Sequence, residues 1–240
     1  MKHTSVVEDY LKAIWGLQQI ERPVATSRIA ERLDLTAAAV TAMIKRLADQ
    51  KLVRHEPYRG VILTPAGELS ALRIIRRHRV LELFLTETLG YEWDRVHDEA
   101  ERLEHAASDE LIERLARLLG EPERDPHGSL IPTAEGTVDR EKLPALPELP
   151  PDAAATVVEV RVQSPDRLRY LGSLDLFPGA GVVVREQAPF GGPLSVEVNG
   201  AARVLARELA EQILVRPASR DEPPTEVPPA EDASRKAGAE

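Results

Sequence analysis

The sequence predicts an α+β protein in which helical segments precede a small all-β domain. Apolar residues recur at the 3.6-residue spacing of amphipathic helices through most of residues 5–119. A proline-rich stretch then interrupts this pattern, and short β-branched segments, in part alternating at strand spacing, follow it. A chain of 240 residues is long enough for one to three modest domains with a sizeable core.

The first 66 residues begin with two predicted helices. We expect a helix over residues 5–20, whose apolar face consists of Val6, Tyr10, Ile14 and Leu17. The stretch "RPVATSRIAERLDL" predicts a second, short helix that begins near Thr26 or Ser27. Either hydroxyl is suited to cap the N-terminus of that helix.

The next stretch completes a winged helix-turn-helix pattern. Thr36 is the expected N-cap of a third helix. Its buried stripe consists of Val40, Ile44 and Leu47. Residues 52–55 and 61–64 then predict two strands, which are joined by a turn that contains Pro57 and Gly60. Two helices and a tight turn before a third helix, followed by a hairpin, predict this fold over residues 1–66.

Residues 67–132 predict an all-α domain. Helices are expected over residues 68–89, 94–106 and 108–119, and a following glycine and proline end the last helix. These helices carry more leucine, isoleucine and valine than a small winged helix can cover. We therefore expect a homodimer.

The rest of the chain predicts a linker, a small β-barrel and a tail. Residues 133–153, with "LPALPELPP", predict a linker that is stiffened by proline. Residues 154–216 contain "ATVVEVRV", "GAGVVVRE" and "LSVEVNG", which are short strand-like segments between turns. Residues 217–240 are proline-rich and charged, with almost no large apolar groups, and are expected to be disordered.

The charge is divided unevenly along the chain. Residues 1–80 carry 14 lysines and arginines against 8 acidic residues, whereas the remaining 160 residues carry 17 against 32. A basic first third attached to an acidic remainder favours double-stranded DNA as the partner of the winged helix. A role of this domain as a protein-interaction module stays open at this point.

Other bulk features exclude several classes of protein. The chain contains no cysteine, which excludes disulfides, thiolate zinc sites and iron–sulfur clusters held by cysteine. No apolar run approaches the roughly 18 residues of a membrane-spanning helix, and the N-terminus lacks the apolar core of a signal peptide. We therefore expect a cytoplasmic protein without a membrane partner.

If the winged helix binds DNA, its third helix is expected to enter the major groove. The polar side chains that can reach bases and phosphates there are Thr36, Thr41 and Lys45. The methyl groups that can contact thymine are those of Ala37, Ala38 and Ala39. The phosphate contacts are assigned to Arg28, Arg54 and Arg59, for each of which a merely solvated position is the alternative.

The stretch "VHDEAERLEH" places potential metal ligands along one helical stripe. These ligands are His97, Glu101, Glu104 and His105. On the preceding helix His78 and Glu82 stand at i and i+4, and Asp9 adds a carboxylate from the first helix. A solvated charged face would produce a similar stretch. Four of the six histidines nevertheless fall within 50 residues of one another, which favours a divalent-metal site.

A metal-dependent hydrolase would also use glutamate and histidine. The sequence has no HExxH motif, no nucleophile motif and no glycine-rich phosphate loop. We therefore predict that the chain is not an enzyme.

Several of these segments together resemble one family. "EDYLKAIW", "SRIAERLDLTAAAVTAMIKRLADQKLV", "LTPAGE", "RRHRVLELFL" and "VHDEAERLEH" resemble the diphtheria-toxin-repressor family of metal-dependent transcriptional repressors, including its manganese transport regulator branch. The resemblance covers about residues 1–132 closely. The C-terminal barrel is similar to the SH3-like (FeoA-like) domain of that family.

The resemblance implies two metal sites per chain. The primary, activating site would be formed by Asp9, Glu101, Glu104 and His105. The ancillary site would be formed by His78, Glu82 and His97. The segment "DPHGSLIP" resembles one that adds ligands to the ancillary site in manganese-responsive members with a barrel, which makes Asp125 and His127 further candidates.

Three departures from the family pattern refine these expectations. Iron-responsive members have methionine and cysteine where this chain has Asp9 and Glu101. Carboxylate oxygens are harder ligands than sulfur, so Asp9 and Glu101 favour Mn²⁺, with Fe²⁺ as the alternative. Lys12 stands where manganese regulators without the barrel place a glutamate, and a charged ammonium group cannot ligate a metal. The barrel ligands of iron-responsive members have no clear match, and the remaining candidates are Glu159, Gln163 and Asp166.

The resemblance also implies a mechanism. Without metal, the carboxylates of Asp9, Glu101 and Glu104 are expected to repel one another and to leave the first helix loosely attached. A cation would order the homodimer so that two recognition helices, about 34 Å apart, bind a palindromic operator of metal-uptake genes. Metal and DNA would then raise each other's affinity by the same factor. A metal-independent winged-helix regulator is the alternative.

Overall fold

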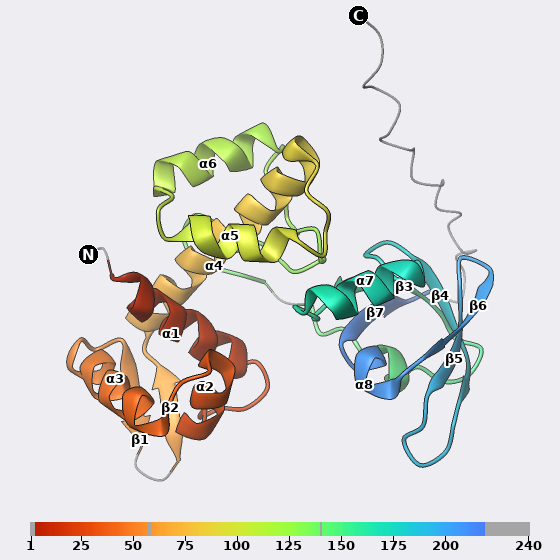
Figure 1. Cartoon of the computed structure of the whole chain (residues 1–240), viewed down its shortest axis with the longest axis horizontal. Helices are drawn as coiled ribbons and strands as arrows, with labels where there is room; N and C mark the ends of the chain where they lie inside the picture. The colour runs from red at the N-terminus through yellow and green to blue at the C-terminus, as the bar shows by residue number, and fades with distance from the viewer. Residues whose placement is uncertain (1–2, 57–58, 140, 219–240) are drawn as a thin grey trace, which may run out of the picture. The chain divides into compact units, whose positions relative to one another are not determined.

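The computed structural model describes residues 3–56, 59–139 and 141–218 (Figure 1). The chain divides into two compact units, Met1–Arg140 and Glu141–Glu240. The helical domains predicted from the sequence make up the first unit, and the predicted β domain makes up the second. The predicted disordered tail lies, from residue 219 onward, outside the described residues.

The first unit begins with the expected three helices. These are α1 (Ser5–Leu17), α2 (Thr26–Leu33) and α3 (Ala37–Asp49). The Thr36 side chain accepts a hydrogen bond from the Ala39 backbone N–H and caps α3, as predicted. The predicted cap of α2 is wrong. Ala25 is the N-cap, because Thr26 already has helical geometry, and neither Thr26 nor Ser27 makes a side-chain cap there.

The wing is a short antiparallel hairpin. Strand β1 (Val53–Glu56) pairs with β2 (Gly60–Leu63), so that Val53 lies opposite Leu63. Pro57, which was expected in the turn, lies outside the described residues. Gly60 has a φ of +131°, and a Cβ atom there would lie 2.2 Å from the Val24 carbonyl oxygen, so only glycine fits this close approach.

Three further helices complete the first unit. They are α4 (Pro65–Leu89), α5 (Val96–Glu104) and α6 (Asp109–Leu118). The Thr64 and Ser108 side chains cap α4 and α6 by accepting from backbone N–H groups, and Gly90 ends α4 in the left-handed conformation. Helix α5 is shorter than the predicted 94–106 segment, because Arg95 and His105 are its cap residues.

Helix α4 belongs to both hydrophobic cores of the first unit. Its first half contributes Ala71, Leu72 and Ile75 to a core shared with α1, α2, α3 and the wing. Its second half contributes Val80 to a separate core with α5 and α6. The helix runs as one 25-residue element through both cores (Figure 1). It therefore links the winged helix to the helices that follow.

Arg76 lies in α4 between these two cores. Its guanidinium group donates two 2.8 Å hydrogen bonds to the Glu113 carboxylate on α6 and one of 2.9 Å to the Pro132 carbonyl oxygen. The Arg76 side chain is only 11% exposed, and the hydrogen bonds and charge of Glu113 raise its pKa despite burial. Arg76 thus joins α4, α6 and the segment after α6.

We expect Arg76→Met to lower the free energy of unfolding by about 2 kcal/mol, because it leaves the Pro132 carbonyl and the Glu113 carboxylate without this donor. Urea unfolding followed by circular dichroism measures the change. Arg73→Met is the matched control on the same helix, since Arg73 is exposed, and we expect it to change stability by less than about 0.5 kcal/mol. Equal losses in both variants would contradict this account.

The second unit is built on a five-stranded antiparallel sheet. Its strands are β3 (Ala154–Val160), β4 (Gly181–Gln187), β5 (Leu194–Val198), β6 (Ala201–Leu205) and β7 (Ile213–Pro217). Among the described residues the order is β6-β5-β4-β3-β7, so the strands form an SH3-like sheet and not the closed barrel that was expected. Register shifts in the β3–β7 and β4–β5 ladders mark irregularities in the sheet.

Two parts of the second unit differ from the sequence prediction. The helix α7 (Pro165–Ser173) was not predicted, because it buries only Leu168 and Leu171 and is too short for a clear helical period. Leu146 and Leu149 lie within the segment expected to be a linker, yet they are 0% and 5% exposed. A 3₁₀ turn that includes Leu146 packs against β4, β7 and the short helix α8 (Arg207–Ala210).

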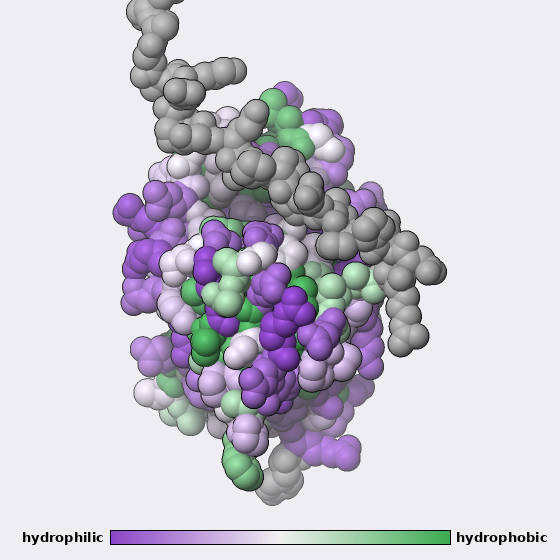
Figure 2. Space-filling model, turned by 90° about the vertical axis from the view of Figure 1, so that its right-hand side faces the viewer, coloured by the Kyte–Doolittle hydropathy of each residue, from purple (hydrophilic) through white to green (hydrophobic). Residues whose placement is uncertain are grey.

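One face of the molecule is mixed in polarity (Figure 2). Figure 2 shows one face on which small groups of hydrophobic residues are surrounded by hydrophilic ones. In the part of the chain that the structure describes, no helix is both long enough and apolar enough to cross a membrane.

Candidate metal centre

Three groups of histidine and carboxylate side chains lie close together in the first unit. They are Asp9–Glu104–His105, His78–His97–Glu101 and Glu82–Asp125–His127. Within each group the potential ligand atoms all lie within 4.8 Å of one another. The groups draw on α1, α4, α5 and the loop after α6, so the predicted ligands converge although they are far apart in sequence.

The first group joins α1 to the end of α5. His105 Nε2 lies 2.9 Å from an Asp9 carboxylate oxygen and 3.6 Å from Glu104 Oε1. Glu104 is completely buried, whereas Asp9 is partly exposed. Burial raises the pKa of Asp9, and the charges of Glu104 and Glu101 raise it further against the opposing charge of His105. This carboxylate therefore lies in surroundings that favour an additional cation.

Glu8 supports the first group and was not predicted from the sequence. His105 Nδ1–H donates to Glu8 Oε2 at 2.8 Å, and Arg77 on α4 lies 3.5 Å from the other oxygen of Glu8. This hydrogen bond leaves His105 Nε2 to face Asp9. A carboxylate behind a ligating histidine is the common way to fix the orientation of its ring. No sequence signal distinguishes Glu8 from other acidic residues on helix faces.

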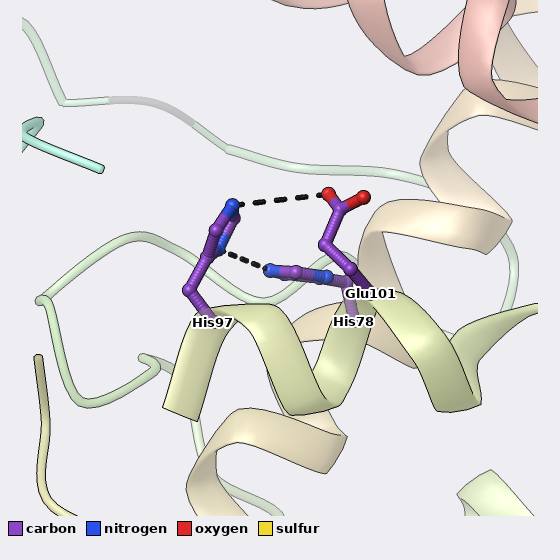
Figure 3. A group of neighbouring side chains, drawn as sticks. All are labelled: His78, His97 and Glu101. Atoms are coloured by element: carbon purple, nitrogen blue, oxygen red, sulfur yellow. Dashed lines mark hydrogen bonds and ion pairs between the residues drawn. The ribbon is translucent and has the colours of Figure 1, made fainter. Parts of the chain in front are cut away.

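The second group is drawn in Figure 3. His78 on α4 and His97 on α5 meet edge to face, with His78 Nε2 3.0 Å from His97 Nδ1. His97 Nε2 lies 3.8 Å from Glu101 Oε1. Glu101, which was expected in the primary site, is therefore grouped here with the two histidines and not with Asp9.

The third group is the most deeply buried. Glu82 is 2% exposed, and Asp125 and His127 are each 7% exposed. Asp125 accepts backbone hydrogen bonds of 2.9 Å from His127 and Ser129, which fixes the loop after α6. Arg79 lies 3.4 Å from Asp125. This loop thus brings the two residues of "DPHGSLIP" next to α4.

Glu82 connects the second and third groups. Its Oε1 atom lies 2.9 Å from His78 Nε2, 3.0 Å from His97 Nδ1 and 3.9 Å from His127 Nδ1. Burial opposes ionisation of Glu82, but the charge and hydrogen bond of His78 outweigh it and hold the pKa of Glu82 well below its usual value. Burial and the charge of Glu82 raise the pKa of Asp125 to about 6. The ancillary ligands therefore form one electrostatically linked cluster.

Lys12 lies among the ligands of the first two groups. Its ammonium donates to Glu101 Oε1 at 2.6 Å and to both Glu104 oxygens at 2.9 and 3.0 Å. Burial tends to raise the pKa of Glu101, but the Lys12 charge and hydrogen bond outweigh it and lower that pKa. The expected repulsion among Asp9, Glu101 and Glu104 is thus partly cancelled within the chain itself.

The residues present fit a divalent metal ion. Each group offers carboxylate oxygens together with imidazole nitrogen, the combination that suits Mn²⁺, Fe²⁺ and Zn²⁺. The chain contains no cysteine to favour a softer ion. Several of these acidic groups are buried, which is costly for a carboxylate unless a cation or a donor compensates it.

Comparison with known protein families decides the classification. Residues 2–61 match the model of the iron-dependent repressor N-terminal DNA-binding domain, and residues 64–133 match that of the iron-dependent repressor metal-binding and dimerisation domain. Residues 145–217 match the FeoA domain. The chain is 32% identical over 221 residues to the iron-dependent repressor IdeR of Mycobacterium tuberculosis, and the match covers 87% of this chain and 95% of IdeR. The chain belongs to the iron-dependent repressor family.

This membership confirms the predicted family, domain types and general function. A diphtheria toxin repressor of Corynebacterium jeikeium is 36% identical over 139 residues, which cover 56% of this chain and 58% of that protein. The iron-dependent repressor described here is thus a metal-dependent, DNA-binding transcriptional regulator. The family consists of repressors and not of enzymes, as the sequence predicted.

Solved structures agree with this family. A manganese-dependent transcriptional repressor in complex with manganese is 39% identical, with a TM-score of 0.82 over 88% of this chain and all of that chain. ScaR with bound Zn²⁺ is 34% identical, with a TM-score of 0.77 over 88% of this chain and 98% of that chain.

The predicted DNA-binding residues of this repressor lie on exposed parts of α2, α3 and the wing. Thr41 donates its hydroxyl hydrogen to the Ala37 carbonyl, and the Thr36 hydroxyl caps α3, so both hydroxyls already have partners within the helix. Lys45 is exposed on α3, as are the three alanines of its first turn. Arg28 pairs with Glu31, and Arg54 and Arg59 both lie near Glu56. These exposed pairs leave the arginines accessible to phosphates.

The metal-free repressor is expected to become less stable as the pH rises from 6.5 to 9. Burial opposes protonation of His78, but Glu82 and Glu104 outweigh it and raise the pKa of His78 from 6.5 to about 9. A folded-state pKa above the unfolded value contributes stability that is complete below pH 6.5 and lost as the pH passes through about 9. The loss is on the order of 3 kcal/mol. Urea unfolding of chelator-treated protein at several pH values measures it.

Two variants make this prediction specific. His78→Gln should remove the decline, whereas His55→Gln, on an exposed wing residue, should keep it. The raised pKa of Asp125 makes stability depend on pH between 3.8 and about 6, which is below the pH range tested for His78. A wild-type stability that does not change between pH 6.5 and 9 would rule out the protonated His78 ion pairs.

Proposed function

We propose that manganese(II), with iron(II) as the alternative, activates this repressor through a primary site at Asp9, Glu104 and His105. The observation that carries the proposal is that Asp9 comes from α1 whereas Glu104 and His105 come from the end of α5. A bound cation supplies positive charge that these ligands share. Ligation by all three residues requires α1 and α5 to stay packed together.

The same residues connect the metal to the DNA-binding surface. Asp9 lies on α1, and α1 shares its hydrophobic core with the recognition helix α3 through Leu11, Ile14 and Val40. Glu104 and His105 are anchored to α4 through α5. The ligands therefore set how the winged helix is held on the helical domain, and a state with the ligands together is favoured when metal is present.

We assign the ancillary site to the buried cluster around Glu82. Its ligands are proposed to be Glu82, Asp125 and His127, with His78 and His97 adjacent. Together with the primary site this gives two metal sites per chain. Glu101 remains a candidate ligand at the boundary of the two sites, and Glu159, Gln163 and Asp166 of the second unit remain candidates for a contribution from that unit.

We propose that the active form is a homodimer that binds a palindromic operator. The family model for residues 64–133 describes a metal-binding and dimerisation domain. Large apolar side chains on α5 and α6 are exposed in the single chain, namely Leu103, Leu111 and Leu118. Leu111 and Leu118 share one face of α6, which is suited to an isologous contact. Two copies of α3 would then read half-sites about one DNA turn apart.

The proposed targets are genes for manganese or iron uptake, repressed in the cytoplasm when the metal is plentiful. The test is a titration of operator binding by chelator-treated protein with Mn²⁺, Fe²⁺, Co²⁺ and Zn²⁺ at constant salt, because salt alone changes DNA affinity. We expect Mn²⁺ or Fe²⁺ to raise the affinity by roughly 5- to 150-fold. Equal affinity of chelator-treated and Mn²⁺- or Fe²⁺-replenished protein would refute metal activation.

A further inference from the structure

The ammonium group of Lys12 occupies a position that is itself lined like a metal site. Glu101 and Glu104 supply carboxylate oxygens at 2.6 to 3.0 Å from Nζ, and His78 Nδ1 lies at 3.2 Å. These are the same donor types that form the three groups described above. Lys12 is a single positive charge held by ligands that would otherwise suit a divalent cation.

The charges around Lys12 explain why a cation is needed there. Glu104 is completely buried, and the Lys12 side chain is only 19% exposed. A buried carboxylate is costly without a compensating charge, and Glu104 Oε2 lies 2.5 Å from His78 Nδ1 as well as 2.9 Å from Lys12. Glu101 depends on the same ammonium group. Removal of the Lys12 charge would leave Glu104 with His78 at 2.5 Å and Glu101 with His97 at 3.8 Å, and neither carboxylate would keep an ammonium partner.

Lys12 also acts from the same helix as a proposed metal ligand. It follows Asp9 by three residues, so both side chains project from one face of α1 toward α5. Asp9 approaches His105, and Lys12 approaches Glu101 and Glu104. Besides the contacts of Asp9 and Glu8 with His105, Lys12 therefore joins α1 to α5 through two further carboxylates.

We infer that Lys12 is a built-in cation, which occupies the position between Glu101, Glu104 and His78 and thereby limits the number of metal ions that the chain binds. In this arrangement Lys12 separates the Asp9–Glu104–His105 site from the cluster around Glu82. It also keeps α1 attached to α5 in the metal-free protein. The inference rests on the proposed function, because it concerns the same ligands.

The test is the number of Mn²⁺ ions bound per chain, measured by equilibrium dialysis and elemental analysis of the full-length protein. Lys12→Met, which keeps the length of the side chain and removes its charge, should bind one more ion per chain than wild type. Lys12→Gln is the second neutral variant and should do the same. Lys12→Arg keeps the charge and should bind the wild-type number, as should Lys142→Met, which removes an exposed lysine of the second unit.

A second readout does not depend on bound metal. The melting temperature of chelator-treated Lys12→Met should fall by about 5 °C relative to wild type, because Glu101 and Glu104 then lack the charge of Lys12. Saturating Mn²⁺ should restore most of this loss. Lys142→Met should leave the melting temperature of chelator-treated protein unchanged.

The outcomes separate this inference from the proposed function. If wild type binds Mn²⁺ but Lys12→Met and Lys12→Gln bind the same number of ions as wild type, the inference about Lys12 is wrong while the proposed function stands. If wild type binds neither Mn²⁺ nor Fe²⁺, the proposed function fails and the inference fails with it. One additional ion in both neutral variants, and none in Lys12→Arg, supports the inference.

Discussion

Glu104→Ala is expected to abolish the response of DNA binding to metal. The Glu104 carboxylate lies close to His105, His78 and Lys12 at the same time, and it is completely buried. Its loss removes a proposed ligand of the primary site. We expect the affinity for Mn²⁺ at this site to fall by more than the roughly 10- to 100-fold that loss of an outer-shell partner costs.

The expected consequence for DNA follows from the reciprocity of binding. If metal raises DNA affinity by a factor of roughly 5 to 150, a variant without the primary site should bind DNA as weakly as the metal-free wild type. Fluorescence anisotropy with a labelled operator, with and without Mn²⁺ at fixed salt, measures both values. Glu104→Ala should bind the operator with the same affinity with and without Mn²⁺.

A matched control separates this effect from a general loss of acidic charge. Glu87→Ala changes an exposed glutamate on α4 and should keep the full response to metal. Circular dichroism should show that the secondary structure of Glu104→Ala is intact. A Glu104→Ala protein that responds to Mn²⁺ like wild type would instead support a merely solvated acidic stripe.

Local sequence signals predicted the elements that carry the site. The spacing of His78 and Glu82 on one helix, and of His97 and Glu101 on another, follows directly from helical geometry. Thr36 was identified as a cap because its hydroxyl precedes a helical pattern. These features depend on residues within one or two turns of each other, which is the range over which sequence periodicity is informative.

Long-range contacts were outside the reach of these signals. Asp125 and His127 join Glu82 only because the loop after α6 folds back on α4, and family resemblance, not periodicity, indicated them. The placement of Glu101 with His78 depends on how α1 inserts Lys12 between the acidic side chains. Glu8 likewise gains its role from His105, 97 residues away. Such contacts depend on tertiary packing, which one sequence does not specify by pattern.

Ala38→Glu is expected to abolish operator binding while leaving the metal sites intact. Ala38 lies in the first turn of α3 and is exposed, on the surface assigned to the major groove. A glutamate there would place a negative charge beside phosphates and base edges. Like-charge contacts at an interface cost several kcal/mol, so DNA affinity should fall by about 100-fold or more.

The fold of the variant should be preserved for a physical reason. Acidic residues near a helix N-terminus interact favourably with the helix dipole, so the glutamate should not destabilise α3. Equilibrium dialysis should give the wild-type number of Mn²⁺ ions per chain. The melting temperature should also stay close to that of wild type.

The control variant adds the same negative charge at a position far from α3 in the sequence. Ala218→Glu alters an exposed residue at the end of the second unit and should leave operator affinity nearly unchanged. The difference between the two variants therefore reports the position of the charge and not its presence. If Ala38→Glu binds the operator as tightly as Ala218→Glu, α3 does not enter the groove by its first turn. The exposed Arg54 and Arg59 of the wing would then be the next residues to substitute.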